Sequence, residues 1–256
     1  MRVPEGVVLL AAGSGSRLAP LTDNCHKSLL PLAGIPALKR TLDEILAAGV
    51  EDVVVVTGYR HADIENFLSA NYHGIVRCVF NKYYKIDVNI LSAELGVMAL
   101  RHPDHGYMIV ETDVIVESKG WEILLDIGDA TRSFWATSGK YSESLTGGTL
   151  QADSQGNVTS LVYRPLYDSR YKGWLKLLGI LYVGRPQVAM DCLTRRRAIM
   201  NSIEQYYMMP WTKNLSSLPC FARDLGTHFA ASYNDFGSYQ YADAEFQRIS
   251  ELRERF

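Results

Sequence analysis

Two glycines and two cations stand close together near the N-terminus, in a pattern suited to binding phosphate. Gly13 and Gly15 follow an apolar run, and Arg17 and Lys27 come after them along the chain. Small residues let backbone N–H groups approach phosphate oxygens, and concave arrays of such groups favour anions. The two side chains would add positive charge at the β- and γ-phosphates and along the path of transfer. The segment therefore predicts a site for a nucleoside triphosphate.

Two common nucleotide-binding motifs do not fit this segment. Leu18 stands where the dinucleotide fingerprint G-x-G-x-x-G has its third small residue. The Walker pattern also fails, because no Gly-Lys-Ser or Gly-Lys-Thr follows the loop. A Rossmann dehydrogenase and a P-loop NTPase are therefore disfavoured.

A carboxylate is expected near the same loop. The apolar run 107–111 predicts a strand that would deliver Asp113 at its carboxyl end. Mg²⁺ takes hard oxygen ligands, usually one or two carboxylates together with substrate phosphates. No histidine or nucleophile triad stands out, which agrees with transfer between phosphate groups. Asp113 is therefore a candidate metal ligand and catalytic residue.

The composition excludes several classes of partner. Of 256 residues, 47% are hydrophobic and 21% are charged, and the net charge is −2. These values indicate a packed core and give no reason to expect binding to nucleic acid or to an anionic membrane. No apolar stretch approaches the roughly 20 residues of a membrane span. The cysteines are scattered and form no CxxC pair, so we expect a cytoplasmic protein without a disulfide framework or structural zinc.

Alternating strands and helices must position the phosphate loop. Apolar runs predict buried strands at 6–12, 53–57, 75–80 and 107–111, with helices near 36–48, 64–68 and 90–101. This alternation predicts an α/β fold, with a Rossmann-like, mostly parallel sheet and helices on both faces. The glycine loop then lies at the carboxyl end of the first strand, where such sheets bind their ligands.

The second half has a different pattern, which predicts a mixed-sheet extension. Strands are expected at 133–138, 149–152, 158–162, 176–183 and 228–233, with helices near 187–208, at 212–218 and from about 239. We interpret 1–256 as one domain, in which 1–116 bind the nucleotide and 117–256 bind the acceptor. The run Arg195–Arg197 is expected on an exposed helix face. Four aromatic residues could form a wall for the acceptor or belong to the core: Tyr206, Tyr207, Trp211 and Tyr233.

The loop resembles the hallmark of the sugar-phosphate nucleotidyltransferase superfamily. That hallmark is L-A-A-G-x-G-x-R-L-x-P-L-T followed by K-x-L-L-P, and here it spans Leu10–Thr22 and Lys27–Pro31. The resemblance implies that Arg17 and Lys27 contact the triphosphate and serve catalysis. It also implies that the main chain around the loop holds the nucleotide, at Leu10, Ala12, Gly13, Ser14 and Gly15.

Two further motifs resemble the metal-binding positions of this superfamily. Val110–Val114 is similar to L-E-G-D-x, whose aspartate binds the metal, with Thr112 at the usual glycine position. Asn234–Ser238, followed by a predicted helix, is similar to D-I-G-T. The resemblance implies that Asp113 and Asp235 converge in space and hold Mg²⁺.

A third resemblance points to the branch of phosphocholine and aminoethylphosphonate cytidylyltransferases. The segment 81–92 is similar to its pattern N-x-x-Y-x-x-x-N-x-x-S, which implies that Asn81, Asn89 and Ser92 lie at the nucleotide and Tyr84 towards the acceptor. Lys176 aligns with the lysine of the branch's K-T-V-N-I-Y, which implies contact with the acceptor's phosphate or phosphonate.

The predicted activity is transfer of CMP from CTP to a small phosphorylated or phosphonate acceptor, with release of pyrophosphate. Two alternatives stay open: a sugar-1-phosphate nucleotidyltransferase that uses UTP, GTP or dTTP, and a non-catalytic regulatory protein that binds nucleotide. Neither nucleic acid nor membrane is expected as a partner. The oligomeric state is left open, a homodimer included.

Overall fold

Four parallel strands from the first half of the chain form the centre of the structure. The computed structural model describes residues 2–129, 131–143 and 145–254. The parallel strands are β1 (Gly6–Ala11), β4 (Val53–Thr57), β5 (Val76–Phe80) and β6 (Gly106–Glu111), in the spatial order β5-β4-β1-β6. Their bounds agree with the predicted runs to within a residue or two. The predicted parallel sheet is confirmed.

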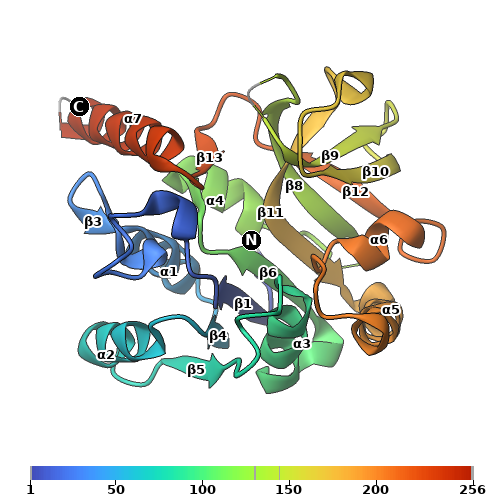
Figure 1. The fold of residues 1–256 in the computed structure, drawn as a ribbon. Coiled ribbons are helices and arrows are strands. Elements are labelled where there is room, and N and C mark those ends of the chain that lie inside the picture. The colour runs from blue at the N-terminus through green and yellow to red at the C-terminus, as the bar shows by residue number, and fades with distance from the viewer. Residues whose placement is uncertain (1, 130, 144, 255–256) are drawn as a thin grey trace.

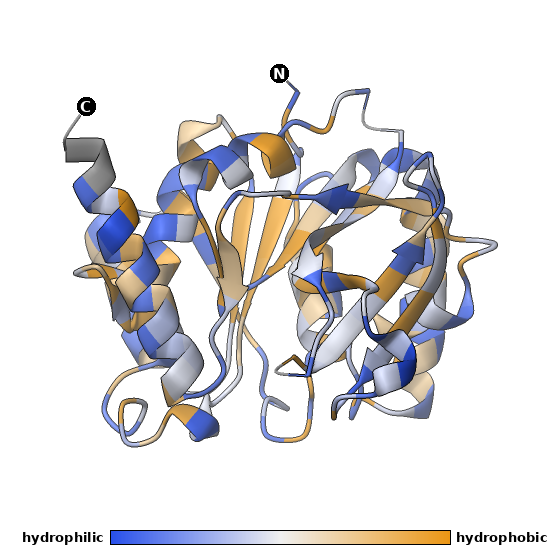
Figure 2. Cartoon of the chain, turned by 90° about the horizontal axis from the view of Figure 1, so that it is seen from above, coloured by the Kyte–Doolittle hydropathy of each residue, from blue (hydrophilic) through white to orange (hydrophobic). Residues whose placement is uncertain are grey.

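Helices cover both faces of these strands. On β1, Val7 and Leu9 pack into one apolar cluster, whereas Val8 and Leu10 pack into another on the opposite face. The first cluster includes residues of α1 (Ala37–Ala47), α2 (His61–Tyr72) and α4 (Ser118–Leu125). The second includes residues of α3 (Ile90–Ala99) and α5 (Val188–Asn201). Because both faces are covered, β1 and β4 are buried along their whole length and almost entirely apolar, and Figure 2 shows the central strands in orange.

The second half extends the same sheet, as predicted. The added strands are β8 (Ser133–Lys140), β9 (Gly147–Ala152), β10 (Val158–Arg164), β11 (Leu175–Gly184) and β12 (Cys220–Asp224). β11 pairs antiparallel with β6, and β9 and β10 form the expected hairpin, so nine strands make one mixed sheet (Figure 1). The interpretation of 1–256 as a single domain stays a prediction.

Several elements of the second half differ from the prediction. α5 ends at Asn201 because Ser202 has extended backbone, and α6 (Met209–Lys213) begins separately with Pro210 in its first turn. The predicted helices near 187–208 and at 212–218 were therefore wrong in extent. β7 (Val114–Val116), α4 and β12 were not predicted, nor were the short strands β2 (Pro31–Leu32) and β3 (Ile35–Pro36). The chain ends with β13 (Ala230–Ser232) and α7 (Phe236–Glu254), which begins earlier than expected.

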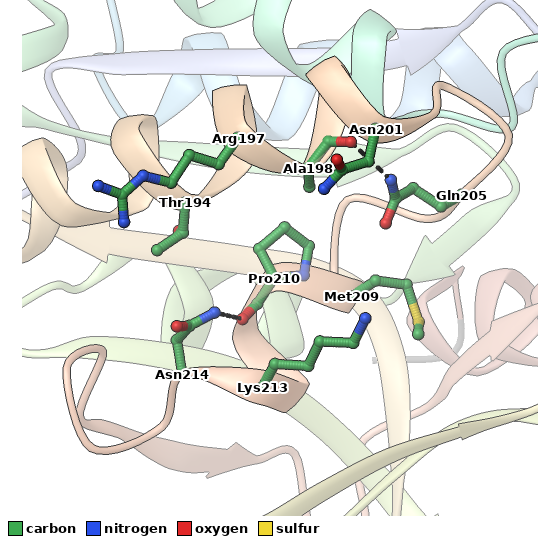
Figure 3. Close-up of a pocket in the computed structure, with 9 residues that line it drawn as sticks. All are labelled: Thr194, Arg197, Ala198, Asn201, Gln205, Met209, Pro210, Lys213 and Asn214. Atoms are coloured by element: carbon green, nitrogen blue, oxygen red, sulfur yellow. Dashed lines mark hydrogen bonds between the residues drawn. The ribbon is translucent and has the colours of Figure 1, made fainter.

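The expected exposure of the arginine run of α5 holds for Arg196 and Arg197 but was wrong for Arg195. Arg195 is 1% exposed and makes ion pairs with Glu94 on α3 and with Asp191 on its own helix. Arg196 also pairs with Glu94, at 2.5 Å. Arg197 lines a cavity of about 280 Å³ between α5 and α6, together with Lys213 (Figure 3). Buried carboxylates thus draw one arginine of the run inward.

No helix in the described part of the chain has the length and apolar character needed to cross a membrane.

Candidate active site

The predicted site lies where the strand order of the sheet reverses. From β1 the chain continues to β4 on one side, whereas β6 lies on the other side of β1. The carboxyl ends of β1 and β6 are adjacent, because Leu10 lies opposite Glu111. Open parallel sheets bind their ligands in the crevice at such a switch point. The glycine loop follows β1 and Asp113 follows β6, so both lie at this edge.

Gly15 has no side chain and therefore leaves space for Lys27 beside the loop. Gly15 has a φ of 64°, in the left-handed region that favours glycine. A Cβ at this position would stand 2.9 Å from Cβ of Lys27, so a side chain would push the lysine away. The Thr22 hydroxyl donates to the Gly15 carbonyl at 3.1 Å. Gly13 and Ser14 are exposed, which leaves the loop open to a ligand.

Lys27 and Asp113 meet as an ion pair. Lys27 Nζ lies 2.7 Å from Asp113 Oδ2, and the two side chains are 14% and 9% exposed. The neighbouring Thr112, at the usual glycine position, does not have a positive φ, and its hydroxyl donates to the Leu10 carbonyl at 2.9 Å. One predicted cation and one predicted carboxylate therefore come together, although 86 positions separate them in the sequence.

The C-terminal part of the chain returns to the same place. β13 pairs antiparallel with β7, and the Tyr233 N–H donates to the Asp113 carbonyl at 2.9 Å. The buried Tyr233 hydroxyl donates to the Lys27 carbonyl at 3.1 Å. Arg17 Nη2 donates to Asn234 Oδ1 at 3.0 Å. These contacts place the segment that carries Asp235 beside Asp113 and Arg17.

Asp235 is held in the ionised form at the start of α7. Its Oδ1 accepts hydrogen bonds from the backbone N–H and the hydroxyl of Ser238, at 2.9 Å and 2.8 Å. These bonds, followed by the charge of Arg17, lower the pKa of Asp235. In residues 2–129, 131–143 and 145–254, no group of three or more His, Cys, Asp and Glu side chains could hold a metal. Two carboxylates at one edge suit Mg²⁺, whose remaining ligands would be phosphate oxygens and water.

Asn81 and Ser92 occupy a different environment from the one that the resemblance implies. Both are buried, and the Asn81 amide donates to Asp87 Oδ2 at 2.8 Å and to the Ser92 hydroxyl at 2.9 Å. The Ser92 hydroxyl in turn donates to Asp87 at 2.7 Å. This network folds the segment between β5 and α3 onto itself. Both side chains thus shape this segment, and their predicted contact with the nucleotide stays a prediction.

Tyr84 lies on the side of the glycine loop. A Cβ at Gly58 would stand 2.5 Å from Cβ of Tyr84 and 2.7 Å from the Ala12 carbonyl, so the three residues are packed together. Tyr84 is partly exposed. Its predicted place towards the acceptor stays a prediction.

Lys176 and Glu111 are two buried groups whose charges act on each other. The Lys176 ammonium donates to the carbonyls of Gly148 and Leu177, at 3.2 Å and 2.8 Å. Burial lowers the pKa of Lys176 to about 8, and the charge of Glu111 opposes this shift. Burial, then the charge of Asp113, raises the pKa of Glu111 to about 7. Sequence reasoning gave Glu111 no role, although it immediately precedes the Thr112–Asp113 pair.

The aromatic residues divide between the core and the site. Tyr207, Trp211 and Tyr233 are 3%, 0% and 0% exposed, so they belong to the core. Tyr206 is partly exposed, and its ring lies 4.4 Å from the ring of Tyr163 on β10. Of the four, Tyr206 alone has an exposed surface to offer a ligand.

His26 is a buried neighbour of Lys27 that sequence reasoning did not single out. It is fully buried before Lys27, and its Nδ1 accepts from the Ser28 N–H at 3.2 Å and lies 2.7 Å from the Ser28 hydroxyl. Burial, then the charge of Lys27, lowers the pKa of His26 to about 4. No sequence pattern distinguishes this histidine, because its lowered pKa results from burial in the folded protein.

Acid is expected to destabilise the protein through His26. The unfolded chain takes up a proton near pH 6.5 but the folded chain only near pH 4, so stability falls as the pH drops through this window, by about 3 kcal/mol from this group. Denaturant unfolding of the wild type and of His26→Asn, measured between pH 7 and pH 4, checks this. The variant should lose part of the pH dependence, whereas the exposed-site control His73→Asn should keep it. An unchanged pH dependence in His26→Asn would contradict the assignment.

The sequence is similar to a known protein family and to several characterised relatives. The sequence matches the Nucleotidyl transferase family over residues 6–170. It is 30% identical over 162 residues to choline-phosphate cytidylyltransferase of Haemophilus influenzae, covering 51% of this chain and 68% of that protein. It is 26% identical over 162 residues to UTP–glucose-1-phosphate uridylyltransferase of Haloferax volcanii, covering 62% of this chain and 64% of that protein.

The fold has a close counterpart among solved structures. The structure of CTP:phosphocholine cytidylyltransferase from Streptococcus pneumoniae superposes with a TM-score of 0.78, at 20% identity, covering 96% of this chain and all of that one. At this identity the likeness concerns the fold, and it confirms the Rossmann-like architecture. With the match over residues 6–170, this chain belongs to the Nucleotidyl transferase family.

Proposed function

We propose that this protein transfers CMP from CTP to a small phosphorylated or phosphonate acceptor and releases pyrophosphate. The observation that carries the proposal is the Lys27–Asp113 ion pair, set beside Gly15 at the switch point of the sheet. The name of the Haemophilus relative, choline-phosphate cytidylyltransferase, supports both the nucleotide and the class of acceptor. The resemblance of segment 81–92 to that branch is further sequence similarity in the same direction.

The reaction needs charge neutralisation more than a general base. An acceptor oxygen forms a bond to the α-phosphorus, and the bond from the α-phosphorus to the bridging oxygen breaks, so pyrophosphate leaves with the electron pair. A phosphate monoester has its second pKa near 6, so the attacking oxygen is already ionised at neutral pH. The obstacle is repulsion between two anions, which Lys27 and Arg17 reduce by binding the triphosphate. Lys176 would hold the acceptor's phosphate.

Magnesium fits this arrangement. Asp113 and Asp235 would hold Mg²⁺, which would offset the negative charge of the triphosphate and orient it for transfer. Asp113 is also restrained by Lys27, and Asp235 by Ser238, so both carboxylates keep their positions without a ligand. Such restraint reduces the cost of assembling the site.

A sugar-1-phosphate nucleotidyltransferase is the second candidate, because the Haloferax relative is named for UTP and glucose-1-phosphate. A non-catalytic regulatory protein is less well supported. Arg17, Lys27, Asp113 and the Asp235 segment all lie at one edge, whereas binding without turnover does not require the full set.

A substrate panel tests the proposal. Each of CTP, UTP, GTP and dTTP is combined with phosphocholine, 2-aminoethylphosphonate or glucose-1-phosphate, with Mg²⁺ or with a chelator. Pyrophosphate release and the product mass are measured. We expect turnover with CTP and one of the first two acceptors, and loss of turnover with the chelator. Turnover confined to UTP, GTP or dTTP with glucose-1-phosphate would select the second candidate. Nucleotide binding without turnover would select the regulatory one.

A further inference from the structure

Asn89 joins two segments that come from different halves of the chain. It lies immediately before α3, and its Nδ2 donates to Glu111 Oε1 at 2.9 Å. Its Oδ1 accepts from the backbone N–H of Tyr207 at 2.8 Å. The side chain therefore bridges the last residue of β6 and the segment between α5 and α6. Its amide and its carbonyl each already have a partner within the protein.

Backbone hydrogen bonds run beside this bridge. The Val88 N–H donates to the Ile203 carbonyl at 3.2 Å, and the Ile90 N–H donates to the Gln205 carbonyl at 3.3 Å. Residues 88–90 and 203–207 therefore lie side by side. Asn89 lies between the two residues that make these backbone hydrogen bonds. Its own hydrogen bond from the Tyr207 N–H extends the contact between the two segments.

The other end of the bridge is also fixed. Glu111 Oε2 occupies the space that a Cβ at Gly179 of β11 would take, so the glycine leaves room for the carboxylate. β6 and β11 are paired along Gly106–Val110, which holds this corner rigid. Glu111 therefore accepts the hydrogen bond of the Asn89 amide from a fixed position at the end of β6.

The segment 203–207 carries the exposed aromatic of the site. Tyr206 packs against Tyr163 of β10 with ring centres 4.4 Å apart. Burial and a hydrogen bond with Tyr206 raise the pKa of Tyr163, and the charges of Glu111 and Arg17 also act on it. A Cβ at Gly147 would stand 3.6 Å from Lys176 Nζ and 3.9 Å from Cε2 of Tyr163, so the Tyr163–Tyr206 pair lies near the Lys176 ammonium. Movement of residues 203–207 would move this pair.

We propose that Asn89 is a positioning residue of the acceptor side, which holds residues 203–207, and with them the Tyr163–Tyr206 pair, in place against Glu111. The inference rests on the proposed function. It differs from the place near base and ribose that the family pattern implies for Asn89. A nucleotide contact would lower affinity for the triphosphate when removed, whereas a positioning role on the acceptor side lowers affinity for the acceptor.

Two measurements on Asn89→Ala test the inference. In hydrogen exchange by NMR, which needs no turnover, the Tyr207 amide should lose protection while the amides of β1 and β4 keep theirs. In steady-state kinetics with Mg²⁺ and the substrates found active for the wild type, KM for the acceptor should rise about tenfold and KM for the triphosphate should stay within twofold. The matched control is Asn71→Ala on α2, whose exposed amide contacts its own helix.

The outcomes separate this inference from the proposed function. Unchanged protection of Tyr207, or a rise in KM for the triphosphate without one for the acceptor, would overturn the role of Asn89. A wild-type chain without turnover on any substrate pair would overturn the proposed function and the acceptor assignment with it. The exchange measurement would still decide whether Asn89 holds the segment.

Discussion

Replacement of Asp113 by asparagine is expected to reduce pyrophosphate release by about a thousandfold. The amide keeps the size of the side chain but removes the charge that pairs with Lys27 at 2.7 Å. It also removes one of the two carboxylates proposed to hold Mg²⁺. Lys27 would then lack a fixed partner, and the triphosphate would lose both the metal and an ordered cation. Steady-state turnover with the best substrate pair measures the effect.

The control for this variant is Asp104→Asn. Asp104 precedes β6, at the opposite end of that strand from Asp113, and its side chain is 75% exposed. Its replacement should leave turnover within twofold of the wild type. Turnover of Asp113→Asn at a third or more of the wild-type rate would contradict both the metal site and the proposed mechanism.

Replacement of Arg195 by alanine is expected to cost about 3–5 kcal/mol of the free energy of unfolding. Arg195 is fully enclosed and pairs with Glu94 on α3 and with Asp191 on α5. Asp191 also accepts from the Trp211 indole N–H at 2.7 Å, which ties α6 to the same cluster. Removal of the guanidinium leaves the buried Asp191 without a cation, with only neutral hydrogen-bond donors such as the Trp211 indole, and leaves Glu94 with the more exposed Arg196 as its remaining partner.

Equilibrium unfolding in urea measures this loss. The neighbouring Arg197→Ala serves as the control, because Arg197 is exposed on the same helix and should change stability by no more than about 0.5 kcal/mol. A loss below about 1 kcal/mol for Arg195→Ala would show that the cluster contributes little. If neither variant lost stability, the burial of Arg195 between Glu94 and Asp191 would be contradicted.

The parallel half of the fold could be predicted because its strands are apolar on both faces. Val53–Thr57 was predicted with its observed bounds, since a continuous run of β-branched residues between polar residues and Gly58 has few other interpretations. The meeting of Lys27 and Asp113 also followed from the sequence, because the carboxyl ends of parallel strands share one edge.

The remaining features depend on long-range contacts that no local pattern records. Arg195 is buried because Glu94, 101 positions away, accepts from it. Asn81 and Ser92 lie inward because Asp87 between them accepts from both. The end of α5 was misplaced because residues 202–208 retain apolar side chains for packing after the helix has ended.

The pairing of β13 with β7 beside the glycine loop has a consequence for the order in which the site forms during synthesis. Tyr233 contacts Thr112 from 121 positions further along, and Arg17 reaches Asn234 from near the start. During translation, the glycine loop and Asp113 leave the ribosome long before these partners do. A nascent chain that has completed β1, β4 and β6 therefore carries the glycine loop and Asp113 without Tyr233 and Asn234, and the contacts that join these segments form only after residue 234 has been synthesised.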